Sequence, residues 1–144
     1  MLGIRLKDAK SMFFDRPAVQ GMMTTRSRSV LSKFGAFVRR SAKGLVRPRK
    51  RASRPGEPPS SHTGNLRDFI FFGYDNASES VVIGPVKLGA KAKNVPELLE
   101  YGGLATLTSG PEMGKKYKLA PRPYMGPALD ANDEKLPGLW AGVI

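Results

Sequence analysis

The longest regular pattern of apolar residues lies in the first third of the chain and predicts one long helix. Apolar side chains recur there at three- and four-residue intervals, which places them in a single stripe along about eight helical turns. Asp15 and Pro17 suit the start of this helix, and Pro48 suits its end. We expect the stripe to face the rest of the domain. Its members are Val19, Met22, Met23, Val30, Leu31, Phe34, Phe37, Val38, Ala42 and Leu45.

Alternating patterns predict strands in three further places. A short period-two pattern covers residues 2–6. The β-rich runs 67–74 and 80–86 flank a polar turn and predict a β-hairpin, and 104–108 with 116–119 predict a second one. In the first hairpin, apolar residues occupy both alternating sets of positions, so we expect both faces of its leading strand to be covered.

Helix signals in the second half of the chain are short. Asn94 as a cap and an early proline predict two turns over 94–103, and a last short helix is predicted over 127–135. Residues 136–144 form an apolar tail, which suits an inter-subunit arm unless its tryptophan covers the domain's own core. The arm residues are Leu139, Trp140, Val143 and Ile144. Together these patterns predict one α+β domain, 1–144, with the long N-terminal helix packed on a small antiparallel β-sheet.

The charge of the chain is concentrated near its start. Residues 1–60 hold fifteen Lys and Arg against three acids, which accounts for the whole net charge of +12, whereas residues 61–144 carry nine bases and nine acids. The run 47–61 combines five bases with four prolines, and we expect a long, flexible basic loop that forms no packed element. Such a surface suits a DNA path or the docking of an acidic partner. It comprises Arg39, Arg40, Lys43, Arg47, Arg49, Lys50, Arg51 and Arg54.

Residue types that carry catalysis or bind metals are sparse. The chain has no cysteine, which excludes disulfides, thiolate catalysis and sulfur-ligated metal sites, and its single histidine, His62, disfavours a histidine-based site. The glycine-rich run 110–116 lacks the spacing and the Ser or Thr of a phosphate-binding loop. We therefore expect no enzyme activity, no cofactor and no metal. Because no apolar run is long enough for a signal peptide or a membrane span, we expect synthesis in a cytoplasm-like compartment and no membrane partner.

Four short motifs follow the basic loop in order. Thr-Gly-x-Leu-Arg at 63–67 opens a predicted strand, and Val-Ile-Gly-Pro at 82–85 closes its hairpin. Leu-Leu-Glu-Tyr-Gly-Gly follows at 98–103, and Ala-Pro-Arg-Pro-Tyr-Met-Gly-Pro-Ala-Leu at 120–129. This order resembles the small neck and tail-completion proteins of long-tailed bacteriophages, the tail components encoded between the head–tail connectors and the tail tube. The sequence departs from that pattern at Gly103, where a threonine is frequent, and in its richer basic loop.

The resemblance implies a structural virion protein, made in the host cytoplasm and located in the neck. It implies a sixfold homo-oligomeric ring with a tail-completion or terminator role. The partners would be neighbouring connector, stopper and tail-tube proteins, with genomic DNA in the lumen. We expect Glu100 and Arg122 to lie near each other or near a subunit boundary, and a helix to start at Pro127. The motif residues are Thr63, Gly64, Leu66, Arg67, Gly84, Glu100, Tyr101, Gly102, Arg122, Pro123 and Pro127.

Other functions remain open from the residues alone. The basic surface suits a small nucleic-acid-binding protein that coats or compacts DNA as a monomer or dimer, through salt-sensitive and sequence-independent phosphate contacts. No recognised nucleic-acid-binding module accompanies it. An inhibitor or toxin-like binding module is a further alternative, and a solvated basic face without a partner explains the same residues.

Overall fold

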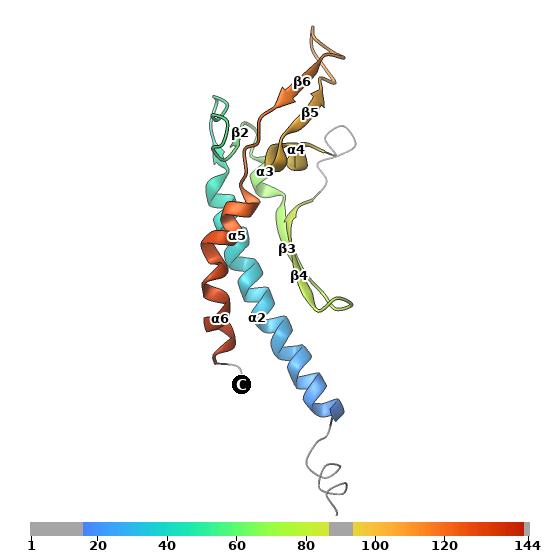
Figure 1. The fold of residues 1–144 in the computed structure, drawn as a ribbon, viewed down its shortest axis with the longest axis vertical. Coiled ribbons are helices and arrows are strands. Elements are labelled where there is room, and N and C mark those ends of the chain that lie inside the picture. Colours follow the sequence, from blue (N-terminus) through green and yellow to red (C-terminus); the bar gives the residue numbers. More distant parts are fainter. Residues whose placement is uncertain (1–15, 87–93, 143–144) are drawn as a thin grey trace, which may run out of the picture.

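The fold is that of a computed structural model of the 144-residue chain, which describes residues 16–86 and 94–142. The strand predicted at residues 2–6 lies outside the described residues. The longest element, α2 (Arg16–Leu45), confirms the predicted long helix and extends through most of the length of the molecule (Figure 1). None of the helices in the described part of the chain has the length and apolar character needed to cross a membrane.

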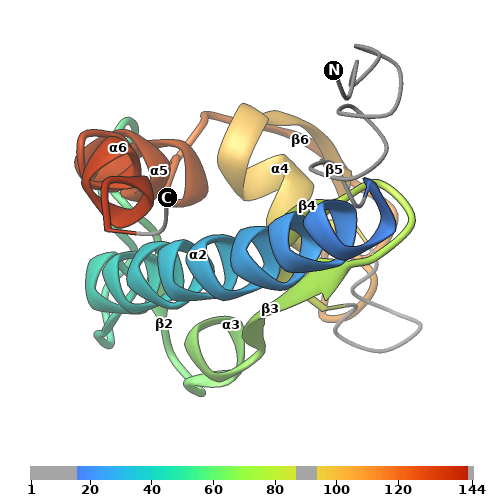
Figure 2. The same ribbon diagram turned by 90° about the horizontal axis from the view of Figure 1, so that it is seen from below.

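Two groups of elements pack on different sides of α2 (Figure 2). The hairpin of β3 (Ile70–Asp75) and β4 (Ser80–Pro85) lies along one side. The C-terminal helices α5 (Met125–Asp133) and α6 (Lys135–Trp140) lie along another. The fold class is therefore α+β, as predicted, with α2 between the hairpin and the short helices.

Within residues 16–86 and 94–142 the strands form three separate two-stranded sheets instead of the single sheet that we expected. Both predicted hairpins are confirmed, the first as β3–β4 and the second as β5 (Gly103–Thr106) with β6 (Lys116–Leu119). They stay apart because β3–β4 lies along α2, whereas β5–β6 projects beyond its C-terminal end, with α4 (Val95–Tyr101) between the two hairpins (Figure 1). The third sheet joins β1 (Arg47–Pro48) in parallel to β2 (Ser60–Ser61).

The hydrophobic core lies against the C-terminal half of α2. Phe34, Val38 and Ala42 are buried at four-residue intervals, and Val46 continues this row just after the helix. The short helix α3 (Asn65–Asp68), β3 and the start of α5 supply the other side. The buried residues from these elements are Leu66, Ile70, Tyr124 and Ala128.

The N-terminal part of the apolar stripe does not pack on the domain, contrary to our expectation. Val19, Met22 and Met23 are exposed, and Met22 keeps 63% of its surface in solvent. The tip of the β3–β4 hairpin meets α2 at Thr24, whose hydroxyl donates to the Glu79 carboxylate over 3.3 Å. Because the hairpin ends there, the preceding residues of α2 have no sheet beneath them.

The Thr-Gly-x-Leu-Arg motif opens a helical turn and not the predicted strand. Residues 65–68 form α3, and β3 begins only at Ile70. Gly64 has a φ of +83°, a left-handed conformation that favours glycine, and its carbonyl accepts a hydrogen bond from the N–H of Asp68 over 2.9 Å. This turn directs Leu66 into the core. The motif therefore sets where the first hairpin leaves the core.

The apolar tail is helical over its described part. Leu136 and Leu139 of α6 pack against the core, and Trp140 is half-buried. Leu136 and Leu139 therefore cover their own domain, which favours the alternative left open for this tail over an inter-subunit arm at Leu139. Val143 and Ile144 lie outside the described residues.

Candidate functional site

Two of the eight predicted surface bases serve the fold. The Nε of Arg39 donates to the carbonyl of Ile70 over 2.7 Å, and its guanidinium lies 5.4 Å from the centre of the Phe71 ring. The Nζ of Lys43 donates to the carbonyl of Asp68 over 3.4 Å. Arg39 and Lys43 therefore hold α2 against α3 and β3, which removes them from the predicted docking surface.

The other six bases form an exposed cluster at the C-terminal end of α2, which we call the basic end. In residues 16–86 and 94–142 the single ion pair joins Lys115 to Glu112, far from this cluster in the chain. Nearby Glu57 directs its carboxylate to the backbone N–H of Arg54 over 3.3 Å. The basic end thus keeps its positive charge without an ion-pair partner. Its members are Arg40, Arg47, Arg49, Lys50, Arg51 and Arg54.

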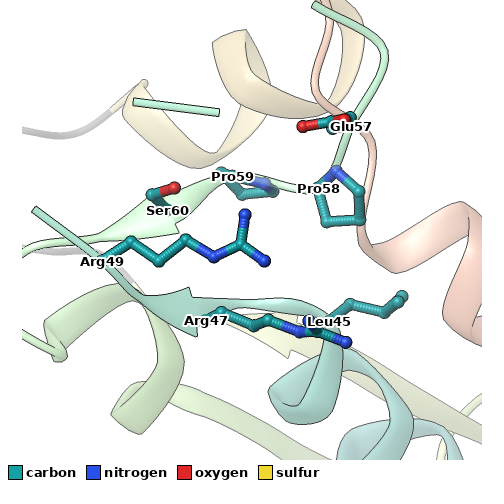
Figure 3. Close-up of a pocket in the computed structure, with 7 residues that line it drawn as sticks. All are labelled: Leu45, Arg47, Arg49, Glu57, Pro58, Pro59 and Ser60. Atoms are coloured by element: carbon teal, nitrogen blue, oxygen red, sulfur yellow. The ribbon is translucent and has the colours of Figure 1, made fainter. Parts of the chain in front are cut away.

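A groove of about 310 Å³ opens within the basic end (Figure 3). The side chains of Arg47 and Arg49 extend in the same direction along it, and Pro58 and Pro59 lie across from them (Figure 3). Pairing of β1 with β2 brings the two walls together, because Arg47 is the register partner of Ser60. The groove therefore presents two guanidinium groups to solvent over a rigid proline wall.

Hydrogen bonds anchor the basic segment 47–61, although its composition led us to expect a flexible loop that forms no packed element. The carbonyl of Ser53 accepts a hydrogen bond from Nε of Arg122 over 3.1 Å, and the N–H of Gly56 donates to the carbonyl of Pro121 over 2.9 Å. Ser53 is buried. These contacts with the segment that leads into α5 supply the packing that the composition of 47–61 does not predict.

The side chain of Glu100 caps the start of α5. Its carboxylate accepts hydrogen bonds from the backbone N–H groups of Tyr124, Met125 and Gly126, over 2.9, 3.0 and 2.8 Å. The first N–H groups of a helix have no partner within the helix, and an anion there is stabilised by the helix dipole. This cap explains why α5 begins at Met125 and not at Pro127 as predicted. We call this contact the α4–α5 joint.

Arg122 belongs to the same joint as Glu100. Its backbone N–H donates to the carbonyl of Leu99 over 2.6 Å, while its side chain reaches Ser53. The two predicted neighbours thus lie on adjoining segments, but each side chain has its own backbone partners. Both are half-buried. Their role in this chain is to fix α5 and the basic segment onto α4.

A glycine is required at position 102, where α4 ends. Gly102 has a φ of +73°, and a Cβ built on it would lie 2.8 Å from the carbonyl oxygen of Leu119. Its N–H closes the helix by donating to the carbonyl of Leu98 over 2.9 Å. The neighbouring Tyr101 is 78% exposed.

The remaining motif residues are spread over the surface around this joint. Gly84 lies in β4 opposite Phe71, and Pro123 is half-buried before α5. Thr63, Arg67 and Pro127 lie at the surface. The structure therefore unites Gly64, Leu66, Glu100, Gly102, Arg122 and Pro123 around the core and the joint, and leaves the others at its edge.

The outward side of the β3–β4 hairpin is apolar, and we call it the hairpin outer face. Phe71 and Val82 are exposed there, Val82 by 64%. Glycine stands opposite each of them, because Gly84 pairs with Phe71 and Gly73 pairs with Val82. The small glycines leave an apolar groove of about 330 Å³. Of the two faces that we expected to be covered, α2 covers the one with Ile70, and this one is open.

Tyr124, the aromatic residue of the motif at 120–129, is a buried residue of the joint that was not among the predicted site residues. It is fully buried, and its hydroxyl has no hydrogen-bond partner within the described structure. Burial raises the pKa of Tyr124 above its ordinary value, and the negative charge of Glu100 raises this pKa further. The hydroxyl is therefore neutral and uncompensated at physiological pH.

No catalytic arrangement is evident from the described residues. Within 16–86 and 94–142 no group of three or more His, Asp or Glu side chains is placed to hold a metal ion. His62 is exposed after β2. Comparison of the chain with protein families, curated proteins and solved structures gave no match.

Proposed function

We propose that this chain is a structural, non-enzymatic subunit of a bacteriophage neck. In this role it forms a homo-oligomeric ring, sixfold by the resemblance, that joins the head connector to the tail in tail completion or termination. Connector or stopper proteins and tail-tube proteins are its neighbours in the virion.

The observation that carries this proposal is the convergence of the motifs behind the resemblance. Each motif is short, but three of them supply groups around one core and one joint: Leu66 enters the core, Glu100 caps α5, and Arg122 holds the basic segment. A common order of such motifs thus has a physical reason, because each fixes one connection of the same architecture. This supports the interpretation that the four motifs come from a shared fold and do not match the family pattern by chance.

The exposed apolar faces support assembly with a second copy. The hairpin outer face, with Phe71 and Val82, and the first turns of α2, with Met22 and Met23, lie at different places on the surface. Contact between two different patches is heterologous, and such contacts close into rings when the rotation between copies allows it. Side chains of this type are costly to leave in water. We propose that the first turns of α2 of one copy cover the hairpin outer face of the next.

The deciding experiment is genetic. The gene is expected to lie in a phage or prophage genome, between connector and tail-tube genes, and a stop codon in it should yield DNA-filled heads and separate tails by electron microscopy. Supplying the chain in trans should restore joined virions. Normal virions without the chain, or a gene remote from any phage genome, would overturn the proposal.

A DNA-compacting protein is the alternative that the basic end favours. It predicts that the purified chain binds duplex DNA tightly as a monomer or dimer at moderate salt. The neck proposal predicts weak binding by a single copy. Mass measurement of the chain with and without DNA, at low and moderate salt, separates the two.

A further inference from the structure

We propose that the basic end contacts the phosphate backbone of duplex DNA, so that in the ring it lines the path of the genome. The proposal rests on the proposed function for the source of the DNA, but the contact itself belongs to this chain. It assigns a partner to the surface that the resemblance leaves without a role.

The unpaired positive charge of the basic end suits the binding of a polyanion. Its six bases have no ion-pair partner among the described residues, and the one nearby acid, Glu57, is engaged by the backbone of the same segment. Five of the six are arginines, whose planar guanidinium groups match phosphate oxygens in a bidentate fashion. A surface of this kind binds phosphates through charge and is blind to base sequence.

The absence of an apolar anchor favours DNA over an acidic protein. Residues 40–61, all of which the structure describes, contain only two large apolar side chains, the half-buried Leu45 and the buried Val46. Stable protein interfaces have an apolar or aromatic centre surrounded by a polar rim. The exposed large apolar side chains of the described residues lie outside 40–61, on the first turns of α2, the β3–β4 hairpin and its flanks, α4, the β5–β6 region and, with Leu129, on α5. Besides charge, the groove of the basic end offers only the half-buried Leu45 and the prolines Pro58 and Pro59 as apolar surface.

The basic segment is held in place before any ligand arrives. Its hydrogen bonds through Ser53 and Gly56 tie it to the chain before α5, and the β1–β2 pairing orients Arg47 and Arg49 along one groove. Anchoring lowers the conformational entropy that binding costs. The groove therefore offers one binding position for a phosphate, and the other bases of the basic end are available to neighbouring phosphates.

One copy meets few phosphates, so binding by the free chain is expected to be weak. Non-specific DNA binding has a Kd of about 10⁻⁴ to 10⁻⁶ M at physiological salt. In a ring, several copies act on one duplex, which raises the effective affinity although each copy binds as before. This distinguishes the proposal from the DNA-compacting alternative, in which a single copy binds tightly.

The test is fluorescence anisotropy of a labelled DNA duplex titrated with the full chain at several salt concentrations. The variant with Arg49→Gln, Lys50→Gln, Arg51→Gln and Arg54→Gln should bind at least tenfold more weakly than the unmodified chain. The slope of log K against log salt should become shallower by about 0.9 for each phosphate that the variant no longer neutralises. The matched control removes the same charge from residues elsewhere, with Arg26→Gln, Lys33→Gln, Lys116→Gln and Lys118→Gln, and should retain binding.

Three results would overturn the proposal. The first is equal weakening in both variants, which would mean that net charge alone attracts DNA. The second is a salt-independent affinity of the unmodified chain, a measurement that stands even if the first variant fails to fold. The third is tighter binding to polyglutamate than to the duplex at the same salt, which would assign the surface to an acidic protein.

The failure of this inference is distinguishable from the failure of the proposed function. A variant chain that no longer binds DNA but still joins heads to tails keeps the neck role and rejects the role of the basic end. A chain that binds DNA through the basic end but is dispensable for joining heads to tails does the reverse.

Discussion

At the scale of single residues, the carboxylate of Glu100 is the most connected group of the α4–α5 joint. Glu100→Ala should lower the free energy of unfolding by about 1–2 kcal/mol, because the backbone N–H groups of Tyr124, Met125 and Gly126 at the start of α5 lose their acceptor. Glu100→Gln keeps an acceptor and should lose less. Urea denaturation measures both effects. Glu97→Ala, in the same helix α4, is the control, and an equal loss in the two alanine variants would contradict the cap.

The buried hydroxyl of Tyr124 gives a prediction about pH. The folded state raises the pKa of this group above that of the unfolded chain, so its contribution to stability is complete below an unfolded pKa of about 10 and is lost as the pH rises above it. The free energy of unfolding of Tyr124→Phe should therefore fall less than that of the unmodified chain when the pH rises from neutral to about 10.5. At neutral pH the substitution should leave the stability unchanged or raise it, because the removed hydroxyl has no partner in the described structure.

Urea denaturation at the two pH values checks this prediction. Tyr101→Phe is its control, since Tyr101 is exposed and should show no effect at neutral pH. A loss of more than about 1 kcal/mol in Tyr124→Phe at neutral pH would mean that the hydroxyl is hydrogen-bonded.

At the scale of elements, a close approach joins α2 to the first hairpin. A Cβ built on Gly35 would lie 2.8 Å from Cγ2 of Val81 and 2.9 Å from Cδ2 of Phe72. Gly35→Ala should therefore destabilise the fold, because overpacking costs about 1–3 kcal/mol and exceeds the gain of about 1 kcal/mol in helix propensity. Gly21→Ala, in the same helix with nothing nearby, should stabilise it by up to that propensity gain. Urea denaturation measures both effects. Equal stabilisation by the two substitutions would contradict the prediction, because it would mean that the β3–β4 hairpin moves to make room for the added methyl group.

At the scale of the whole molecule, the open hairpin outer face predicts how the chain assembles. Val82→Glu places a charge on this face and should prevent ring formation while leaving the monomer folded, because Val82 faces solvent and not the core. Sedimentation velocity over a range of concentrations measures assembly, and circular dichroism measures the fold. Met113→Glu introduces the same charge at an exposed site away from the β3–β4 hairpin. Loss of assembly in both variants, or in neither, would reject the hairpin outer face as the contact.

Several parts of the candidate site lay beyond sequence reasoning for physical reasons. The side-chain amide of Asn132 donates to the hydroxyl of Ser41 over 2.8 Å and so ties α5 to α2, yet a lone asparagine in a polar helix carries no signal of burial. Tyr124 and Gly35 are similar cases, because their environments come from segments far away in the chain. The motifs did predict that Glu100 and Arg122 lie near each other or near a subunit boundary, and the two residues lie on adjoining segments.

The sequence by itself determined the local elements and the division of charge. The long helix, the two hairpins and α4 follow from spacing, caps and turns, which act between residues that are close along the chain. Only the tertiary structure decided which surfaces are used. One face of the β3–β4 hairpin is covered, and the first turns of α2 are exposed. Arg39 and Lys43 bind backbone carbonyls and hold α2 in place, so they do not contribute to the charged surface. Those outcomes depend on interactions across long sequence separations, which no local pattern records.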